Sequence, residues 1–236
     1  MAAKRKDGGK KRRSEKSLGS PDRRLTSTFI SFEGGEGSGK STQAAILAEH
    51  LRAQGHAVVA THEPGGSPAG AVLREVLLAG HAAGKGALAE ACILTSARRE
   101  HVDIVIGPAL DAGKTVVCDR YCDSTRIYQG YVGGVPMETI DKLERVATDG
   151  VMPDCTLVFE VSSDVANARR EARLSVKDDG DDRFEREDSA FHAKVAEGFA
   201  WLCDAYPGRC VKIDADGSEA EVANLVLAAL HQRNLL

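Results

Sequence analysis

Residues 34–41 read Gly-Gly-Glu-Gly-Ser-Gly-Lys-Ser and fit the pattern GxxxxGK[ST]. The glycines let the backbone turn several N–H groups toward one anion, and a helix starting at Lys40 adds the positive end of its dipole. In this pattern the lysine reaches the β- and γ-phosphates of a nucleotide, and the Ser41 hydroxyl ligates Mg²⁺. We therefore predict a nucleotide-binding phosphate loop made of Gly34, Gly35, Glu36, Gly37, Ser38, Gly39, Lys40, Ser41 and Thr42.

The residues on either side of the phosphate loop give it the context that the pattern requires. Residues 28–32 are apolar and β-branched, which is typical of a strand. Residues 40–54 place apolar side chains at helical spacing and end at Gly55, which predicts a helix. A strand before the loop and a helix after it argue against a chance match.

The rest of the chain alternates strands with helices. Apolar runs predict strands at 57–61, 115–119, 156–161 and 210–214, and helical periodicity covers 69–79, 87–112, 136–149, 163–173, 185–205 and 218–234. Strands that are apolar nearly throughout are typical of a parallel sheet covered on both faces. We predict one α/β domain over 28–236, a doubly wound five-stranded parallel sheet with helices on both faces. The charged stretch 174–184 lacks the pattern and is expected to form a mobile lid.

The N-terminal segment differs in net charge from the remaining chain. Residues 1–27 hold ten Lys or Arg against three Asp or Glu, although the whole chain has a net charge of -4. With almost no apolar side chains, this basic tail is expected to be disordered. The basic cluster 10–13 is compatible with a nuclear localisation signal or a nucleic-acid contact. A solvated extension of unknown role is the simpler interpretation. We therefore expect that the protein does not require nucleic acid.

Composition also narrows the function classes. No stretch approaches 18 consecutive apolar residues, and the tail is unlike a secretory signal, so we expect a cytoplasmic protein without a membrane partner. The six cysteines form no CxxC pair, which favours buried, reduced thiols over a metal site. None of the three asparagines is followed by lysine, which argues against the guanine-reading NKxD motif of switch GTPases.

A kinase must hold a second substrate near the phosphate loop and shield both from water. Asp119 and Arg120 follow the carboxyl end of a predicted strand, the edge at which open α/β sheets bind ligands. Asp119 offers a carboxylate for Mg²⁺, together with Ser41. Arginines that suit an acceptor phosphate stand at Arg74, Arg98, Arg99, Arg120 and Arg183.

Five stretches in order resemble the signatures of bacterial thymidylate kinase, a P-loop nucleoside monophosphate kinase family. They are 32–42 (the phosphate loop), 63–68 (Glu-Pro-Gly-Gly-Ser-Pro), 96–101 (Ser-Ala-Arg-Arg-Glu-His), 119–130 (Asp-Arg-Tyr followed by Asp-Ser-Thr-Arg-Ile-Tyr-Gln-Gly) and 182–185 (Asp-Arg-Phe-Glu). The resemblance runs from about residue 29 to the C-terminus. It implies transfer of the γ-phosphoryl group of ATP to dTMP, giving dTDP for dTTP synthesis, with Mg²⁺ as cofactor and a homodimer as the assembly.

The resemblance also implies roles for individual residues. Lys40, Arg120 and the lid arginine Arg183 would be catalytic, and Arg74 and Arg120 match positions beside the acceptor phosphate. Arg98 matches the arginine that reads the thymine carbonyl edge, and Tyr128 the tyrosine that lies against the deoxyribose. The full acceptor-binding set implied is Glu63, Arg74, Leu94, Arg98, Arg120, Ser124, Thr125, Tyr128 and Gln129, with Ser41 and Asp119 as metal ligands.

Two positions depart from the family pattern, and both lie on the acceptor side. His62 stands where the family usually has an arginine, and Leu94 stands where it tends to have a phenylalanine that stacks on thymine. They leave open a kinase of another deoxynucleoside monophosphate or of a deoxynucleoside. A more remote alternative is a non-enzymatic P-loop protein that uses ATP as a switch.

Overall fold

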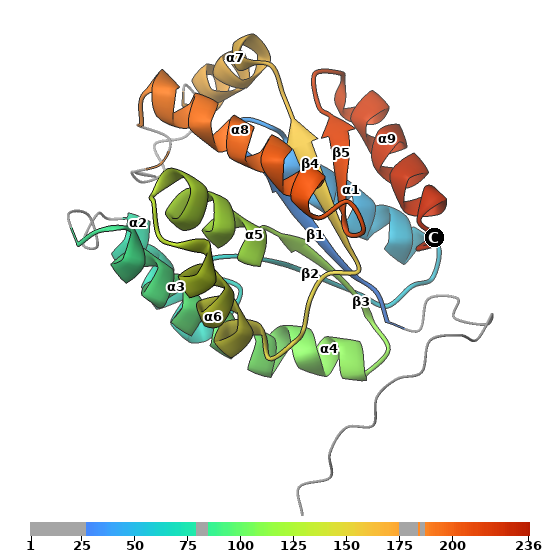
Figure 1. Cartoon of the computed structure of the whole chain (residues 1–236). Helices are drawn as coiled ribbons and strands as arrows, with labels where there is room; N and C mark the ends of the chain where they lie inside the picture. The colour runs from blue at the N-terminus through green and yellow to red at the C-terminus, as the bar shows by residue number, and fades with distance from the viewer. Residues whose placement is uncertain (1–26, 79–84, 175–183, 185–186) are drawn as a thin grey trace, which may run out of the picture.

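The structure is a computed structural model that describes residues 27–78, 85–174, 184 and 187–236. Five strands form one sheet: β1 (Phe29–Gly34), β2 (Val58–His62), β3 (Thr115–Asp119), β4 (Cys155–Glu160) and β5 (Cys210–Asp214). Their order is β2-β3-β1-β4-β5, and all neighbours pair in parallel (Figure 1). The predicted doubly wound five-stranded parallel sheet is confirmed.

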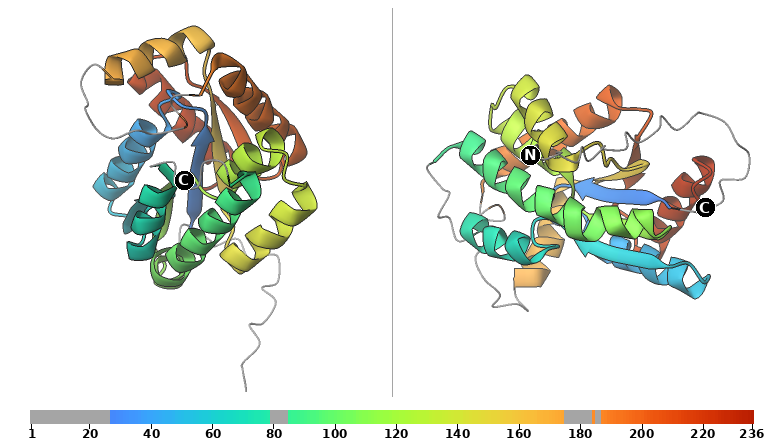
Figure 2. Two further views of the ribbon diagram at one scale, coloured as in Figure 1. Left: turned by 90° about the vertical axis from the view of Figure 1, so that its left-hand side faces the viewer. Right: turned by 90° about the horizontal axis from the view of Figure 1, so that it is seen from below.

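Helices connect the strands and lie on both sides of the sheet (Figure 2). Two π-helical segments, η1 (Val102–Ile106) and η2 (Arg126–Val132), continue from the helices before them. The α-helices within the described residues are α1 (Lys40–Ala53), α2 (Pro68–Leu78), α3 (Ala87–His101), α4 (Gly107–Asp111), α5 (Cys122–Thr125), α6 (Met137–Thr148), α7 (Ser163–Leu174), α8 (Ser189–Ala205) and α9 (Glu219–Gln232).

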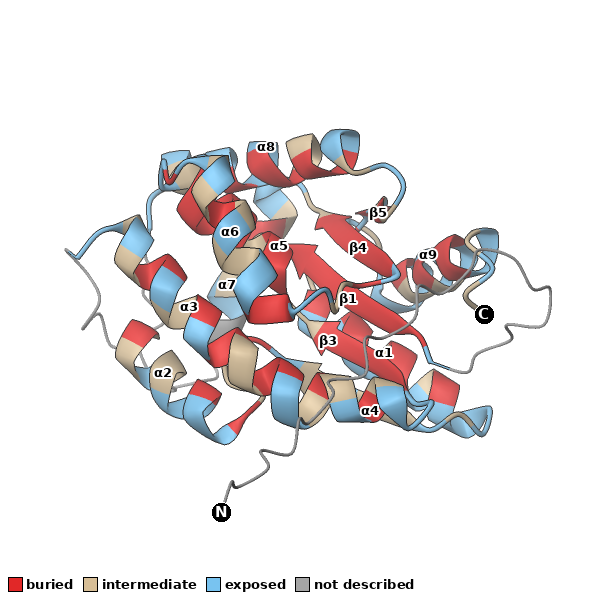
Figure 3. Cartoon of the chain, turned by 60° about the horizontal axis from the view of Figure 1, so that its bottom comes forward, coloured by how far each residue is buried: buried red, intermediate tan, exposed pale blue. Residues whose placement is uncertain are grey.

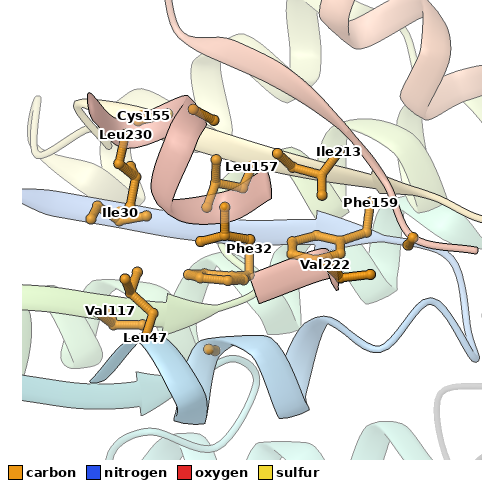
Figure 4. Close-up of a cluster of buried hydrophobic side chains, with 14 of the residues drawn as sticks. Ile30, Phe32, Leu47, Val117, Cys155, Leu157, Phe159, Ile213, Val222 and Leu230 are labelled. Atoms are coloured by element: carbon orange, nitrogen blue, oxygen red, sulfur yellow. The ribbon is translucent and has the colours of Figure 1, made fainter. Parts of the chain in front are cut away.

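Apolar side chains point alternately to the two faces of the sheet, so a hydrophobic core forms on each face. Ile30 and Phe32 of β1 pack with Leu157 and with side chains of α1 and α9 (Figure 4). Phe29, one residue away, faces the opposite side, where η1 and α4 pack, because successive strand side chains point to opposite faces. The central strands β1, β3 and β4 are consequently buried almost throughout (Figure 3).

The ends of the strands create the edge on which the site is built. Phe32 and His62 both pair in register with Asp119, so β1, β2 and β3 end side by side. The residues that follow these positions therefore meet at the carboxyl edge of the sheet, as expected for ligand binding in an open α/β sheet.

Three local features differ from the prediction. The stretch 87–112 is not one regular α-helix but α3, the π-helical η1 and α4. The stretch 122–132 forms α5 and η2. It was not predicted to be helical, because polar residues that line a cavity, such as Thr125 and Gln129, interrupt its apolar periodicity. The predicted helix 185–205 begins at Ser189 in the structure, with the Asp188 side chain accepting a hydrogen bond from the N–H of Phe191.

Two predicted segments cannot be compared with the structure. The basic tail 1–27 and the lid 174–184, with Arg183, lie almost wholly outside the described residues. No helix in the described part of the chain is long and apolar enough to cross a membrane. Five of the six cysteines are buried free thiols, and Cys92 is exposed.

Candidate functional site

The phosphate loop has the conformation that its glycines were expected to allow. Gly37 and Gly39 have φ values of 76° and 84°, in the left-handed region where side chains are unfavourable. A Cβ at Gly37 would also lie 2.6 Å from the carbonyl oxygen of Ala166. No side chain caps the start of α1 at Gly39, so the first N–H groups of the helix are available to an anion.

Lys40 is held inside this loop. Its side chain is only 6% exposed, and Nζ donates to the carbonyl oxygen of Gly35 at 3.2 Å. Burial, and then the neighbouring charge of Arg120, lowers the pKa of Lys40 from its ordinary value. A buried ammonium near another cation is stabilised when a phosphate arrives.

A cavity of about 240 Å³ opens at the carboxyl edge of the sheet and is called the central cavity here. It is lined by Glu36, Lys40 and Ser41 of the phosphate loop, and by Asp119. The structure also brings into it all nine acceptor-binding residues named from the sequence: Glu63, Arg74, Leu94, Arg98, Arg120, Ser124, Thr125, Tyr128 and Gln129. Predicted donor and acceptor residues therefore share one space, and Arg183 is outside the described residues.

Arg120 joins the acceptor side to the phosphate loop. It follows β3 with φ at 67°, and its Nη1 donates to the carbonyl oxygen of Gly34 at 3.1 Å and to Ser124 Oγ at 3.2 Å. Its Nη2 forms an ion pair with Glu36, and the guanidinium lies 5.3 Å from the ring centre of Tyr128. The guanidinium is thereby placed between the loop and the cavity.

A second arginine is fixed by a buried carboxylate. Arg98 Nε donates to Glu63 Oε2 at 2.7 Å, and its Nη2 donates to Thr125 Oγ1 at 3.1 Å. The other Glu63 oxygen lies 2.9 Å from Nδ1 of His101, whose Nε2 is 2.7 Å from Thr61 Oγ1. Both Glu63 oxygens are thus engaged within the protein, so this carboxylate orients Arg98.

The far end of the cavity combines polar and apolar groups. Gln129 Nε2 donates to Glu90 Oε2 at 3.1 Å, while the amide oxygen of Gln129 is buried with no partner among the described residues. Leu94 is half-buried at the cavity wall. A buried amide acceptor aimed into a cavity requires a donor from a ligand or water.

Three groups that hold the site in place were assigned no role from the sequence. Glu90 and His101 each hold a cavity residue, and Glu33, at the end of β1, binds the turn after Arg120. Burial, and then the charge of Asp123, raises the pKa of Glu33 to about 7, while Arg120 and the hydrogen bonds from Ser124 and Tyr121 oppose the rise. The sequence did carry one signal for Glu33, because it is the single charged residue in an otherwise uncharged strand.

Asp119 offers the protein carboxylate best suited to a divalent cation. One of its buried oxygens has no hydrogen-bond partner in the described part of the chain, and it shares the cavity with Ser41. Mg²⁺ usually takes one or two protein oxygens and completes its shell with water and substrate phosphates. These two residues fit that donor set, although the described residues contain no group of three or more His, Cys, Asp or Glu that could hold a metal by themselves.

An adjacent cavity of about 250 Å³ lies beside the phosphate loop. Its walls come from 37–43, Arg169 and the segment 215–222. Arg169 Nη2 donates to the carbonyl oxygen of Gly217 at 3.0 Å, and Gln43 Nε2 donates to that of Glu219 at 2.8 Å. Neither Arg169 nor Gln43 was identified from the sequence, because each acquires its place only when α7, α1 and α9 converge.

Comparison with known proteins gives a consistent answer. The family model described as thymidylate kinase matches residues 32–226. A thymidylate kinase of Nitrobacter winogradskyi is 46% identical over 207 residues (88% of this chain and 89% of that protein), and one of a Synechococcus strain is 46% identical over 205 residues (87% and 95%). The crystal structure of thymidylate kinase from Ehrlichia chaffeensis matches with a TM-score of 0.69 and 34% identity, covering 87% of this chain and 98% of that one. The chain belongs to the thymidylate kinase family.

Proposed function

We propose that this protein transfers the γ-phosphoryl group of ATP to dTMP, giving ADP and dTDP. The observation that carries the proposal is the central cavity, in which the phosphate-loop lysine Lys40 faces a wall formed by all nine predicted acceptor residues. Membership in the thymidylate kinase family supports the same reaction. A P-loop protein that used ATP only as a switch would have no use for such an acceptor wall.

The donor side binds ATP through backbone groups. The uncapped N-terminus of α1 and the phosphate-loop N–H groups receive the phosphates, and Lys40 neutralises charge on the transferring group. The adjacent cavity, with Arg169 at its wall, receives the adenosine end. Water is kept from the reacting atoms by the walls of the central cavity and by the predicted lid.

The acceptor side binds dTMP through side chains. Arg120 and Arg74 bind its phosphate, with Arg120 exchanging its ion pair with Glu36 for the phosphate oxygens. Arg98 and Gln129, already held by Glu63 and Glu90, hydrogen-bond the base. No strong general base is required, because the acceptor phosphate is already an anionic nucleophile.

Ser41 and Asp119 hold Mg²⁺ in this proposal. When bound, the ion neutralises negative charge on the phosphoryl oxygens. Arg183, in the segment outside the described residues, remains the predicted lid residue that completes this neutralisation. The shared cavity supports the pairing of Ser41 with Asp119, and the role of Arg183 rests on the resemblance to the family.

A homodimer is part of the proposal. Leu88 on α3 and Val146 on α6 are 51% and 65% exposed, and α3 packs against α6. Apolar side chains on neighbouring helices suit a face covered by a second copy. A dimer that persists at nanomolar concentration in sedimentation experiments would agree with it, and a monomer at micromolar concentration would contradict it.

A panel of nucleoside monophosphates tests the reaction. ADP formation should be fastest with dTMP and should produce dTDP in equal amount. Equal rates with CMP or AMP would refute the acceptor assignment. Phosphorylation of thymidine instead of dTMP would favour the deoxynucleoside kinase alternative, and ATP turnover with no phosphorylated product would favour the switch.

A further inference from the structure

Glu33 lies beneath the catalytic edge without lining the central cavity. It is the penultimate residue of β1, its side chain is fully buried, and it is the one charged residue of that strand. Its oxygens receive three hydrogen bonds, all from the turn 121–124. Oε1 accepts the N–H groups of Tyr121 at 2.8 Å and Ser124 at 3.2 Å, and Oε2 accepts the Ser124 hydroxyl at 2.6 Å.

Arg120 is attached to the backbone on both sides of Glu33. Its N–H donates to the carbonyl oxygen of Phe32 at 2.8 Å, and its Nη1 donates to that of Gly34 at 3.1 Å. Its left-handed φ of 67° is unfavourable for a residue with a side chain. The hydrogen bonds that Glu33 takes from the following turn therefore help to hold a backbone conformation that Arg120 would not adopt alone.

The Ser124 hydroxyl connects Glu33 to the guanidinium. Because the hydroxyl proton is donated to Glu33, the serine oxygen presents its lone pairs to Arg120 Nη1, 3.2 Å away. Above its pKa of about 7, the Glu33 carboxylate is ionised and can only accept, so it fixes this direction of donation. In a Glu33→Gln side chain, one of the two acceptor oxygens is replaced by an NH₂ donor. That NH₂ would face either the Ser124 hydroxyl or the two backbone N–H groups, so at least one of these donors would lose its acceptor.

We propose that Glu33 is a positioning residue for the acceptor phosphate, which sets the guanidinium of Arg120 through Ser124 and the turn 121–124. The inference rests on the proposed function, because it assigns the purpose of Arg120 to binding of the dTMP phosphate. Glu33 itself touches neither substrate. We expect its effect on ATP binding to be small, since the adjacent cavity, which receives the adenosine end in the proposed function, contains none of these residues.

The test compares Michaelis constants for the two substrates. In the Glu33→Gln protein, KM for dTMP should rise about tenfold while KM for ATP stays within twofold, because only the acceptor arginine loses its support. Ser124→Ala should act in the same direction. KM for dTMP in the double variant should be no higher than in the more affected single variant, since both changes remove the same support from Arg120. Additive effects would show that Ser124 acts independently of Glu33 and would overturn the proposal.

Glu144→Gln is the matched control. Glu144 is a half-buried carboxylate outside the turn, and it binds the guanidinium of Arg126, which does not line the central cavity. It should lower Tm and leave KM for dTMP unchanged. Equal increases in both Michaelis constants for Glu33→Gln, or a lower Tm alone, would leave Glu33 with a structural role only. Failure of the unaltered protein to phosphorylate dTMP would instead refute the proposed function.

If Glu33→Gln does not fold, Ser124→Ala and Arg120→Lys replace it. The proposal then expects their double variant to show the same lack of additivity in KM for dTMP. Additive increases, or no change in the Ser124→Ala protein, would overturn it.

Discussion

The donor and acceptor sides of the central cavity are built in different ways. The predicted donor side is one continuous stretch, 34–42, which combines glycines of positive φ with one buried lysine. The acceptor side gathers predicted side chains from α2, α3, α5, η2 and the turns after β2 and β3. Neighbouring carboxylates hold several of them: Glu63 binds Arg98, Glu90 binds Gln129, and Glu36 of the phosphate loop binds Arg120.

The two sides also differ in whether a buried charge already has its partner within the protein. In the described part of the chain, Lys40 Nζ donates to the carbonyl oxygen of Gly35 at 3.2 Å and lies 3.9 Å from a carboxylate oxygen of Glu36. We therefore expect the ATP phosphates to complete its environment. Arg98 is buried with its partner already in place, 2.7 Å away. We expect changes on the donor side to act chiefly on catalysis, and changes on the acceptor side to act on both stability and substrate recognition.

Lys40→Met should give the largest effect on activity. The loss of charge beside the transferring group should lower kcat at least about a thousandfold, roughly 4 kcal/mol of transition-state stabilisation. Tm should stay the same or rise, because the lowered pKa of Lys40 shows that burial disfavours its ammonium. Coupled kinase assays and thermal melts measure the two quantities. Lys142→Met, on the exposed face of α6, should change neither. If the Lys40→Met protein kept most of its activity, Lys40 would not be the residue that stabilises the transferring phosphoryl group.

Glu63→Ala should give the largest effect on stability. It leaves the guanidinium of Arg98 buried without its carboxylate, which costs about 3–5 kcal/mol in the free energy of unfolding. Urea unfolding measures this loss. Glu138→Ala breaks an exposed ion pair with Lys142 and should cost less than about 1 kcal/mol. Similar losses for the two variants would show that the Glu63–Arg98 pair is not the buried anchor of the acceptor side.

Glu33→Gln should change how stability depends on pH. Because the pKa of Glu33 is raised by burial to about 7 from an ordinary 4.5, the native state retains a proton that the unfolded state releases between these values. The free energy of unfolding of the unaltered protein therefore loses up to about 3 kcal/mol from this group as pH rises from 4.5 through 7. The neutral glutamine removes that loss, so the variant should gain in relative stability between pH 5 and pH 8. A difference that is constant over this range would contradict the raised pKa.

His62→Arg should give the smallest effect and tests the departure from the family pattern. Burial, followed by the charge of Arg74, lowers the pKa of His62, so the imidazole is neutral at pH 7.5 and lends no charge to the cavity. A permanent charge there should lower KM for dTMP about fivefold, near 1 kcal/mol, and leave KM for ATP unchanged. His231→Arg, exposed at the end of α9, is the control. An increase in KM for dTMP would show that the neutral side chain is required at this position.

The phosphate loop and the sheet could be predicted from the sequence because their signals are local. Helix and strand periodicities need only a dozen neighbouring residues, and the glycine pattern encodes its own backbone conformation. The nine acceptor residues were identified through resemblance to a family, and the structure places all nine in one cavity. The helical segment 122–132 was missed because its polar side chains, including Thr125 and Gln129, face that cavity.

By itself, the sequence determined the parallel sheet and the phosphate loop, and the resemblance to a family supplied the predicted acceptor residues. The tertiary structure alone decided which of these residues bind each other: that Glu63 orients Arg98, that Glu33 holds the turn after Arg120, and that Arg169 meets the loop before α9. These pairs join residues from 35 to 88 positions apart. Such contacts depend on the register and order of strands, and no periodicity within a single segment carries that information.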